Sequence, residues 1–182
     1  MSVLSDRQIR KLSLGKKMIE PFVDRQVRDG VVSYGLSSYG YDFRISDEFH
    51  VFRGKKIVDP KNLKPSDFGV VHEKIHLLKP GTTVLAKTVE YFKIPRNIIT
   101  ICFGKSTYAR CGILVNVTPF EPEWEGFATI AITNTSHAAV RIYANEGIAQ
   151  LVFLKADGLC AVSYKDKKGK YQAQKKVTYA KI

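Results

Sequence analysis

Short apolar segments, each ended by glycine or proline, recur along most of this chain and limit what it can fold into. The segments are rich in β-branched and aromatic residues, which favour strands, and the glycines and prolines between them are typical of turns. Many short strands at turn spacing predict a mainly β fold, built as a barrel or a sandwich. The predicted strands cover 31–34, 41–45, 49–52, 70–78, 83–92, 98–103, 113–117, 127–133, 140–142, 148–154 and 161–164.

Two segments predict short helices instead. Near the N-terminus, Ser5 can cap a helix whose Ile9 and Leu12 recur at helical spacing, and Gly15 is expected to end it. The second helix follows Gly104-Lys105 and covers 106–110. Free backbone N–H groups, hydroxyls and a lysine at its start would suit an anion, although Gly-Lys-Ser also begins many ordinary turns.

The length and composition suit one domain over residues 1–182, with no internal repeat and no linker. Hydrophobic residues make up 45% and charged residues 25% of the chain, as in ordinary globular proteins. No apolar run approaches the roughly 20 residues of a membrane helix. The first residues also lack the pattern of a signal peptide, so we predict a cytoplasmic protein without a membrane partner.

Cysteine and charge restrict the chemistry further. Three widely spaced cysteines argue against a disulfide framework, and no zinc-type His-x-Glu with Pro-Cys-x-x-Cys motif is present. The net charge of +12 favours an anionic partner, either nucleic acid or a nucleotide phosphate. Because the excess lysines gather within 165–176 and no aromatic residues alternate with them as a base-stacking platform, nucleic acid is the weaker candidate.

Several longer runs stand out along the chain, at 33–42, 58–62, 90–92, 104–112, 115–119, 121–126, 163–166 and 169–171. These runs resemble the dCTP deaminases of the dCTP deaminase and dUTPase superfamily. They occur in the family's order across nearly the whole chain, which makes the resemblance more specific than any one motif. The segment 120–124 lacks the aspartate of bifunctional relatives, so the resemblance is to the monofunctional bacterial type, without dUTP diphosphatase activity.

The resemblance implies a distorted, dUTPase-like β-barrel (β-clip) with a few short helices, assembled as a homotrimer with active sites between subunits. It implies zinc-independent deamination of dCTP to dUTP and ammonia, which supplies dUTP for thymidylate synthesis. Mg²⁺ would be carried on the triphosphate, with no metal ligand from the protein, and dTTP is a possible inhibitor. The segment 164–182 would close over the nucleotide.

The resemblance also assigns roles to individual residues. Lys105, Ser106 and Thr107 would hold phosphate, with Ser106 also positioning water and base, and Arg110 would be the arginine of the catalytic site. Each expected contact has a plain structural alternative. Ser106 could be a helix cap, Arg110 could form a surface ion pair, and Gln150 could hydrogen-bond within a strand. The tyrosines could pack at the rim of the site. The full set of expected nucleotide contacts is Lys105, Ser106, Thr107, Tyr108, Ala109, Arg110, Val117, Thr118, Pro119, Thr129, Ile130, Ala131, Gln150, Tyr164, Lys170, Tyr171 and Gln174.

Other conspicuous residues are expected to be structural. In Gly-Tyr-Asp-Phe-Arg, the resemblance implies a buried Asp42 that hydrogen-bonds to nearby backbone and arginine. Trp124 is expected in the core. The four histidines have no mutual spacing that indicates metal ligands.

One position departs from the family. The family places a glutamate seven residues after this tryptophan, where it acts as the general base toward the attacking water, and here Ala131 stands at that place. Losing a positioned base typically slows a reaction by about 10²- to 10⁴-fold. Either an active enzyme has been altered at this residue, or a natural homologue has lost catalysis and kept nucleotide binding. The otherwise intact motifs favour the first account.

Overall fold

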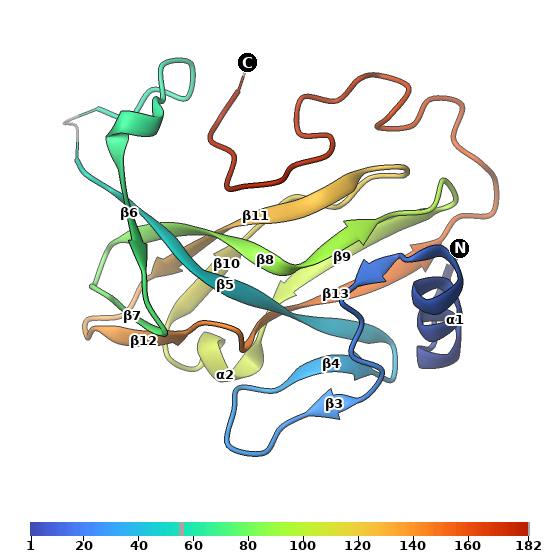
Figure 1. Cartoon of the computed structure of the whole chain (residues 1–182), viewed down its shortest axis with the longest axis horizontal. Coiled ribbons are helices and arrows are strands. Elements are labelled where there is room, and N and C mark those ends of the chain that lie inside the picture. The colour runs from blue at the N-terminus through green and yellow to red at the C-terminus, as the bar shows by residue number, and fades with distance from the viewer. Residues whose placement is uncertain (55–56, 182) are drawn as a thin grey trace.

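The structure is a computed structural model that describes residues 1–54 and 57–181, and it confirms the predicted β class. Over these residues, one eleven-stranded sheet has the order β1-β13-β5-β8-β11-β10, with β2, β3, β4, β6 and β9 paired at its sides. Strands β7 and β12 form a separate two-stranded sheet. The large sheet is strongly curled (Figure 1). The strands are β1 (Ser2–Val3), β2 (Ile19–Glu20), β3 (Gln26–Val27), β4 (Tyr34–Ser37), β5 (Gly40–Phe52), β6 (Phe68–His72), β7 (Ile75–Leu78), β8 (Thr83–Lys93), β9 (Ile98–Gly104), β10 (Ile113–Asn116), β11 (Glu125–Asn134), β12 (Val140–Tyr143) and β13 (Gly147–Lys155).

Most strand predictions differ from the structure in connectivity more than in position. The strand predicted at 31–34 lies three residues too early, because β4 covers Tyr34–Ser37. The segments predicted at 41–45 and 49–52 form one strand, β5, with a register shift against β8 between Ile45 and Phe49. The segment predicted at 70–78 is two strands, because β6 pairs with β5 and β7 pairs with β12. The prediction of a strand at 161–164 is wrong, since that segment begins the irregular C-terminal part.

Both predicted helices form, α1 (Asp6–Lys16) and the short α2 (Ser106–Ala109), and a 3-10 turn covers Pro65–Asp67. Ser5 starts α1 as expected, with its N–H donating to Gln8 Oε1 at 2.9 Å. Gly15 does not end α1. The helix continues to Lys16, since an exposed glycine inside a helix costs only about 1 kcal/mol. The capping residue Lys17 then ends it with a left-handed φ of 53°.

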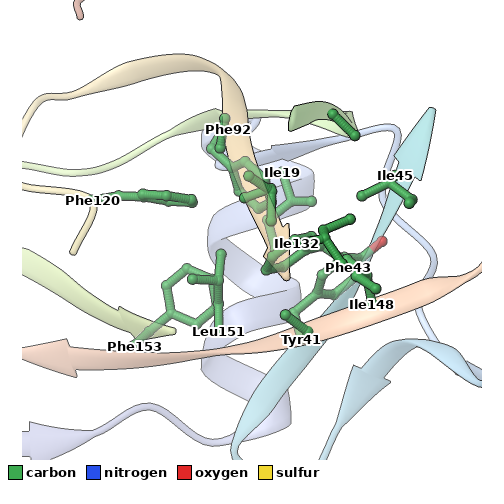
Figure 2. Packing of buried hydrophobic residues seen from close by; sticks show 14 of the residues in the cluster. Ile19, Tyr41, Phe43, Ile45, Phe92, Phe120, Ile132, Ile148, Leu151 and Phe153 are labelled. Carbon is green, nitrogen blue, oxygen red and sulfur yellow. The ribbon is translucent and has the colours of Figure 1, made fainter. Parts of the chain in front are cut away.

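The core lies inside the curled sheet and is almost entirely aliphatic and aromatic (Figure 2). Strand β11 contributes Ile130 and Ile132 to it, whereas Thr129 and Ala131 on the other face are only half-buried, as the two-residue period of a strand requires. Side chains from β5, β8 and β13 meet these isoleucines. The largest fully buried ones are Tyr41, Phe43, Phe49, Phe92 and Phe153.

An ion pair between Arg44 and Glu90 is largely buried beside this core. Glu90 on β8 is fully buried and accepts hydrogen bonds from the backbone N–H of Arg44 at 2.9 Å and from its Nε at 2.8 Å. Burial raises the pKa of the Glu90 carboxyl, and the Arg44 guanidinium opposes that shift. The pair ties β5 to β8 where their register shifts.

Residues 164–181 form no helix or strand and run along one side of the sheet, across β11 (Figure 1). We call them the C-terminal segment. Its first part is anchored by Arg96, which donates to Glu123 and to Asp166, both at 2.7 Å. The chain therefore returns over a strand that lies some forty residues earlier in the sequence.

Candidate functional site

A pocket of about 730 Å³ lies between the C-terminal segment, β11 and the loop that follows β10. Its volume falls within the range of about 300–1,000 Å³ that is usual for sites that bind small molecules. The walls combine aromatic rings, backbone and a few polar groups. The lining residues are Ile99, Asn116, Val117, Thr118, Pro119, Phe120, Glu121, Pro122, Trp124, Ala128, Thr129, Tyr164, Lys170, Tyr171, Gln174, Thr178, Tyr179 and Ala180.

Hydrogen bonds between backbone groups attach the C-terminal segment to the start of β11. Phe127 N–H donates to the carbonyl of Gln174 at 2.9 Å, and Ala173 N–H donates to that of Glu125 at 2.8 Å. Gly126 lies between them with a φ of 145°, and a Cβ there would come within 2.7 Å of Gln174 N. The close approach therefore requires glycine at this position.

Side chains complete the attachment. Thr129 Oγ1 donates to Gln174 Oε1 at 3.1 Å and accepts from Thr178 N–H at 2.9 Å. Trp124 is buried against Phe120, which confirms its predicted place in the core, and its Nε1 donates to the carbonyl of Tyr171 at 2.8 Å. The pocket wall is thus held to β11 from several directions.

The pocket gathers about half of the predicted nucleotide contacts. They come from three separate parts of the sequence, which is the juxtaposition that a real site would need. The predicted residues that line it are Val117, Thr118, Pro119, Thr129, Tyr164, Lys170, Tyr171 and Gln174.

The predicted phosphate-holding residues lie elsewhere. Figure 1 shows α2 on the opposite side of the sheet from the C-terminal segment, and Lys105, Ser106, Thr107, Ala109 and Arg110 do not line the pocket. Arg110 Nη1 donates to the carbonyl of Ser106 at 3.1 Å. Within one chain, the two halves of the predicted site do not meet.

Three other predicted contacts also have structural partners. Tyr108 is buried, its hydroxyl accepts from Tyr143 N–H at 3.0 Å, and burial raises its pKa to about 12. Ile130 is fully buried in the core, so only its backbone could face a ligand. Gln150 donates to Ser37 Oγ at 3.1 Å, which is the hydrogen bond of a strand residue.

The prediction for Asp42 is half right. Its side chain is buried as expected, but its partners are Lys105 Nζ at 2.6 Å and Gln26 Nε2 at 2.9 Å, not an arginine. The arginine of the same motif, Arg44, pairs instead with Glu90 on β8. Asp42 therefore holds Lys105 at the start of α2.

Ala131 lies two residues along β11 from Thr129, on the same face, but unlike Thr129 it does not line the pocket. Its cross-strand partners are Asn116 on β10 and Leu85 on β8. Thr133, the next residue on that face, shares a hydrogen bond with Thr83. No acidic side chain occupies the positions paired with Ala131 or flanking it on its face, all of which the structure describes.

The remaining reactive side chains do not form a second centre. The three cysteines are free, and burial raises the pKa of Cys102 to about 12. His50 bonds to Glu48, and His76 bonds to Glu73. Within 1–54 and 57–181, no cluster of three or more His, Cys, Asp or Glu residues could hold a metal ion. Neither of the helices in these residues has the length and apolar character that a membrane span requires.

Some pocket residues were not among the predicted contacts: Asn116, Thr178, Tyr179 and Ala180. Asn116 lies in the run 115–119, and the other three lie in the segment that the resemblance expects to close over the nucleotide. These two signals pointed to the segments, and only the folded chain shows which of their residues reach the pocket.

Comparison with known proteins agrees with this architecture. A family model described as "dCTP deaminase-like" matches residues 3–156. The chain is 54% identical to the dCTP deaminase of Acidobacterium capsulatum over the full length of both proteins, and 56% identical to that of Nitrosospira multiformis, again over both full lengths. The fold resembles a solved 2'-deoxycytidine 5'-triphosphate deaminase from Agrobacterium tumefaciens, with a TM-score of 0.65 and 14% identity over 83% of this chain and 47% of that one. The chain belongs to the dCTP deaminase-like family.

Proposed function

We propose that this chain binds dCTP in the pocket beneath the C-terminal segment and that its scaffold serves the zinc-independent hydrolysis of dCTP to dUTP and ammonia. The observation that carries the proposal is the gathering of the 117–119 loop, Thr129, Lys170 and Gln174 around one pocket of nucleotide size. The names of relatives at 54–56% identity support the same substrate. Such an activity would supply dUTP for thymidylate synthesis, in the cytoplasm.

The chemistry follows from where the base would lie. With the cytosine edge against the backbone of 117–119, water adds to C4 and a proton moves to the exocyclic amino nitrogen. The bond between C4 and that nitrogen then breaks, ammonia leaves, and C4 becomes the carbonyl of uracil. A carboxylate at position 131 would take the proton from water and return it to the leaving group. Ala131 can do neither, so we expect slow turnover of bound dCTP.

The polar groups fit a triphosphate better than a protein-bound metal. Lys170 lines the pocket, while Lys105, Ser106, Thr107 and Arg110 offer cations and hydroxyls near α2. These are donors to phosphate oxygens and not metal ligands. Mg²⁺ would therefore be held by the triphosphate itself, where it would neutralise part of the phosphate charge.

Because α2 and the pocket lie on opposite sides of one chain, the complete site would need α2 from a second copy. The apolar side chains Ile101 and Phe103 on β9 and Leu114 on the neighbouring β10 are 39%, 55% and 57% exposed, which suits a surface that is covered in an assembly. We therefore propose the homotrimer with sites between subunits.

dTTP is a candidate inhibitor of the same pocket.

Binding of dCTP tests the proposal without requiring turnover. Calorimetry on the unmodified chain is expected to show dCTP binding, and Lys170→Ala is expected to weaken it about 10-fold or more, because a charge-assisted hydrogen bond to phosphate contributes about 1.5–3 kcal/mol. The exposed lysine Lys175 provides the matched control, Lys175→Ala, with affinity close to that of the parent. Equal loss in both variants would contradict a specific role for the pocket.

The assembly is tested by charge insertion. Phe103→Glu is expected to give a smaller species in sedimentation velocity and to lose dCTP binding, because a carboxylate would be buried at the subunit contact. Leu77→Glu, at a residue that is 56% exposed on β7, is the control and should keep both properties. If Phe103→Glu keeps the assembly and binding of the parent, the proposed contact is wrong.

The absence of an acid beside Ala131 supports a second candidate, a non-catalytic nucleotide-binding or regulatory protein on the same fold. It predicts that the Ala131→Glu variant still binds dCTP or dTTP but releases no ammonia from dCTP. Nucleic-acid binding, the remaining alternative, would appear as oligonucleotide affinity that falls steeply with salt.

A further inference from the structure

The end of the C-terminal segment is fastened to the sheet by side chains that are far from it in sequence. Tyr179 stacks on Phe68 of β6, with ring centroids 4.5 Å apart, and its hydroxyl lies 2.6 Å from His50 Nδ1 on β5. His50 Nε2 lies 2.8 Å from Glu48 Oε1. We call Glu48, His50, Phe68 and Tyr179 the C-terminal latch.

The hydrogen-bonding capacities of these groups fix the direction of the chain of bonds. The bond from His50 lowers the pKa of the Glu48 carboxyl, so Glu48 is an acceptor and the Nε2 of His50 carries the proton. In the neutral imidazole with that tautomer, Nδ1 has a lone pair and accepts from the hydroxyl of Tyr179. Burial raises the pKa of that phenol, with the Glu48 charge adding to the shift, so the hydroxyl keeps its proton.

With the latch formed, the end of the C-terminal segment is one wall of the pocket and does not fill it. Thr178, Tyr179 and Ala180 line the pocket, and the volume of about 730 Å³ is the space that remains with these residues in place. Inside the segment, Lys181 N–H donates to Tyr171 Oη at 3.1 Å, so the fastened end also steadies a residue on the opposite part of the wall. A released end would remove one wall of the pocket.

We propose that Glu48, His50 and Phe68 are positioning residues for nucleotide binding: through Tyr179 they hold the C-terminal segment in the conformation that completes the pocket. None of the three lines the pocket itself. Their effect on a ligand passes through the equilibrium between the fastened and the released segment, so each bond lost from the latch lowers the population that can bind. The inference rests on the proposed binding of dCTP.

The test uses the full chain with His50→Ala, Tyr179→Phe and both together. Tyr179→Phe keeps the ring that stacks on Phe68 and removes only the hydroxyl. Tyr39→Phe is the matched control, because Tyr39 is 62% exposed. One readout is amide hydrogen exchange of residues 176–181 without nucleotide, and the other is dCTP affinity by calorimetry.

Tyr179→Phe is expected to speed exchange of the segment and to weaken dCTP binding about 2- to 12-fold, the range given by the net free energy of one hydrogen bond. The double variant should bind about as well as the weaker single variant, because both changes break the same bond. The melting temperature of Tyr179→Phe should stay close to that of the parent, since Tyr179 is half-buried and at the surface.

Unchanged or tighter dCTP binding beside faster exchange would overturn the inference, because the segment would then be irrelevant to the site or would block it. Unchanged exchange in the double variant would overturn the latch itself. A parent chain that binds no dCTP would refute the proposed function, and the exchange measurement would still decide whether these residues fasten the segment.

Discussion

Ala131→Glu is expected to raise the release of ammonia from dCTP by about 10²- to 10⁴-fold over the unmodified chain. The new carboxylate would lie on the same face of β11 as the pocket residue Thr129. Its cross-strand neighbours Asn116 and Leu85 are uncharged, so no existing ion pair is disturbed. Ammonia and dUTP formation, measured at saturating dCTP with magnesium present, check this expectation.

The matched control for that experiment is Thr133→Glu. It puts the same carboxylate on the same face of the same strand, one step further from Thr129. Thr133 is partnered by Thr83, away from the pocket, so this variant should release no more ammonia than the parent. Equal ammonia release by both variants would show that position 131 has no special role. If Ala131→Glu binds dCTP but stays inactive, the non-catalytic candidate is the better account.

Glu90→Ala is expected to destabilise the fold by about 3–5 kcal/mol, the usual effect of removing one partner from a buried ion pair. The Arg44 side chain is only 15% exposed and would lose its carboxylate partner. Its backbone N–H would lose an acceptor at the same time. Urea unfolding followed by circular dichroism would report the change as a lower midpoint with an unchanged slope.

A surface pair provides the comparison. Lys17 and Glu20 lie 3.3 Å apart with side chains 73% and 56% exposed, and such exposed pairs contribute about 0–1 kcal/mol. Glu20→Ala should therefore shift the midpoint only slightly. A similar small shift for Glu90→Ala would show that water or another group replaces the buried carboxylate.

Local chemistry was enough to predict most of the longer strands and the short helix after Gly104-Lys105, but not the two-residue strands β1, β2 and β3. These features depend on residues near one another in sequence: a period of two, β-branched side chains, and glycines or prolines at the turns. The resemblance of whole runs then predicted the family, and the family comparison confirms it. The same runs predicted the lining of the pocket by the 117–119 loop and by Lys170 and Tyr171, where the structure places them.

Contacts between distant residues were beyond the sequence. Periodicity carries no information about which strand pairs with which, so the continuous β5, the partner of Asp42 and the bond between His50 and Tyr179 emerged only from the folded chain. The path of the C-terminal segment is of the same kind, because it has no period of its own and is held by side chains up to 129 residues away.

The sequence by itself determined the fold class and the family, since both depend on the identity and local order of residues. Only the tertiary structure decided how the C-terminal segment attaches to β11 and that α2 lies on the other side of the chain from the pocket. The physical reason is that long-range pairing is set by the joint packing of many strands around one core, and no local pattern specifies it.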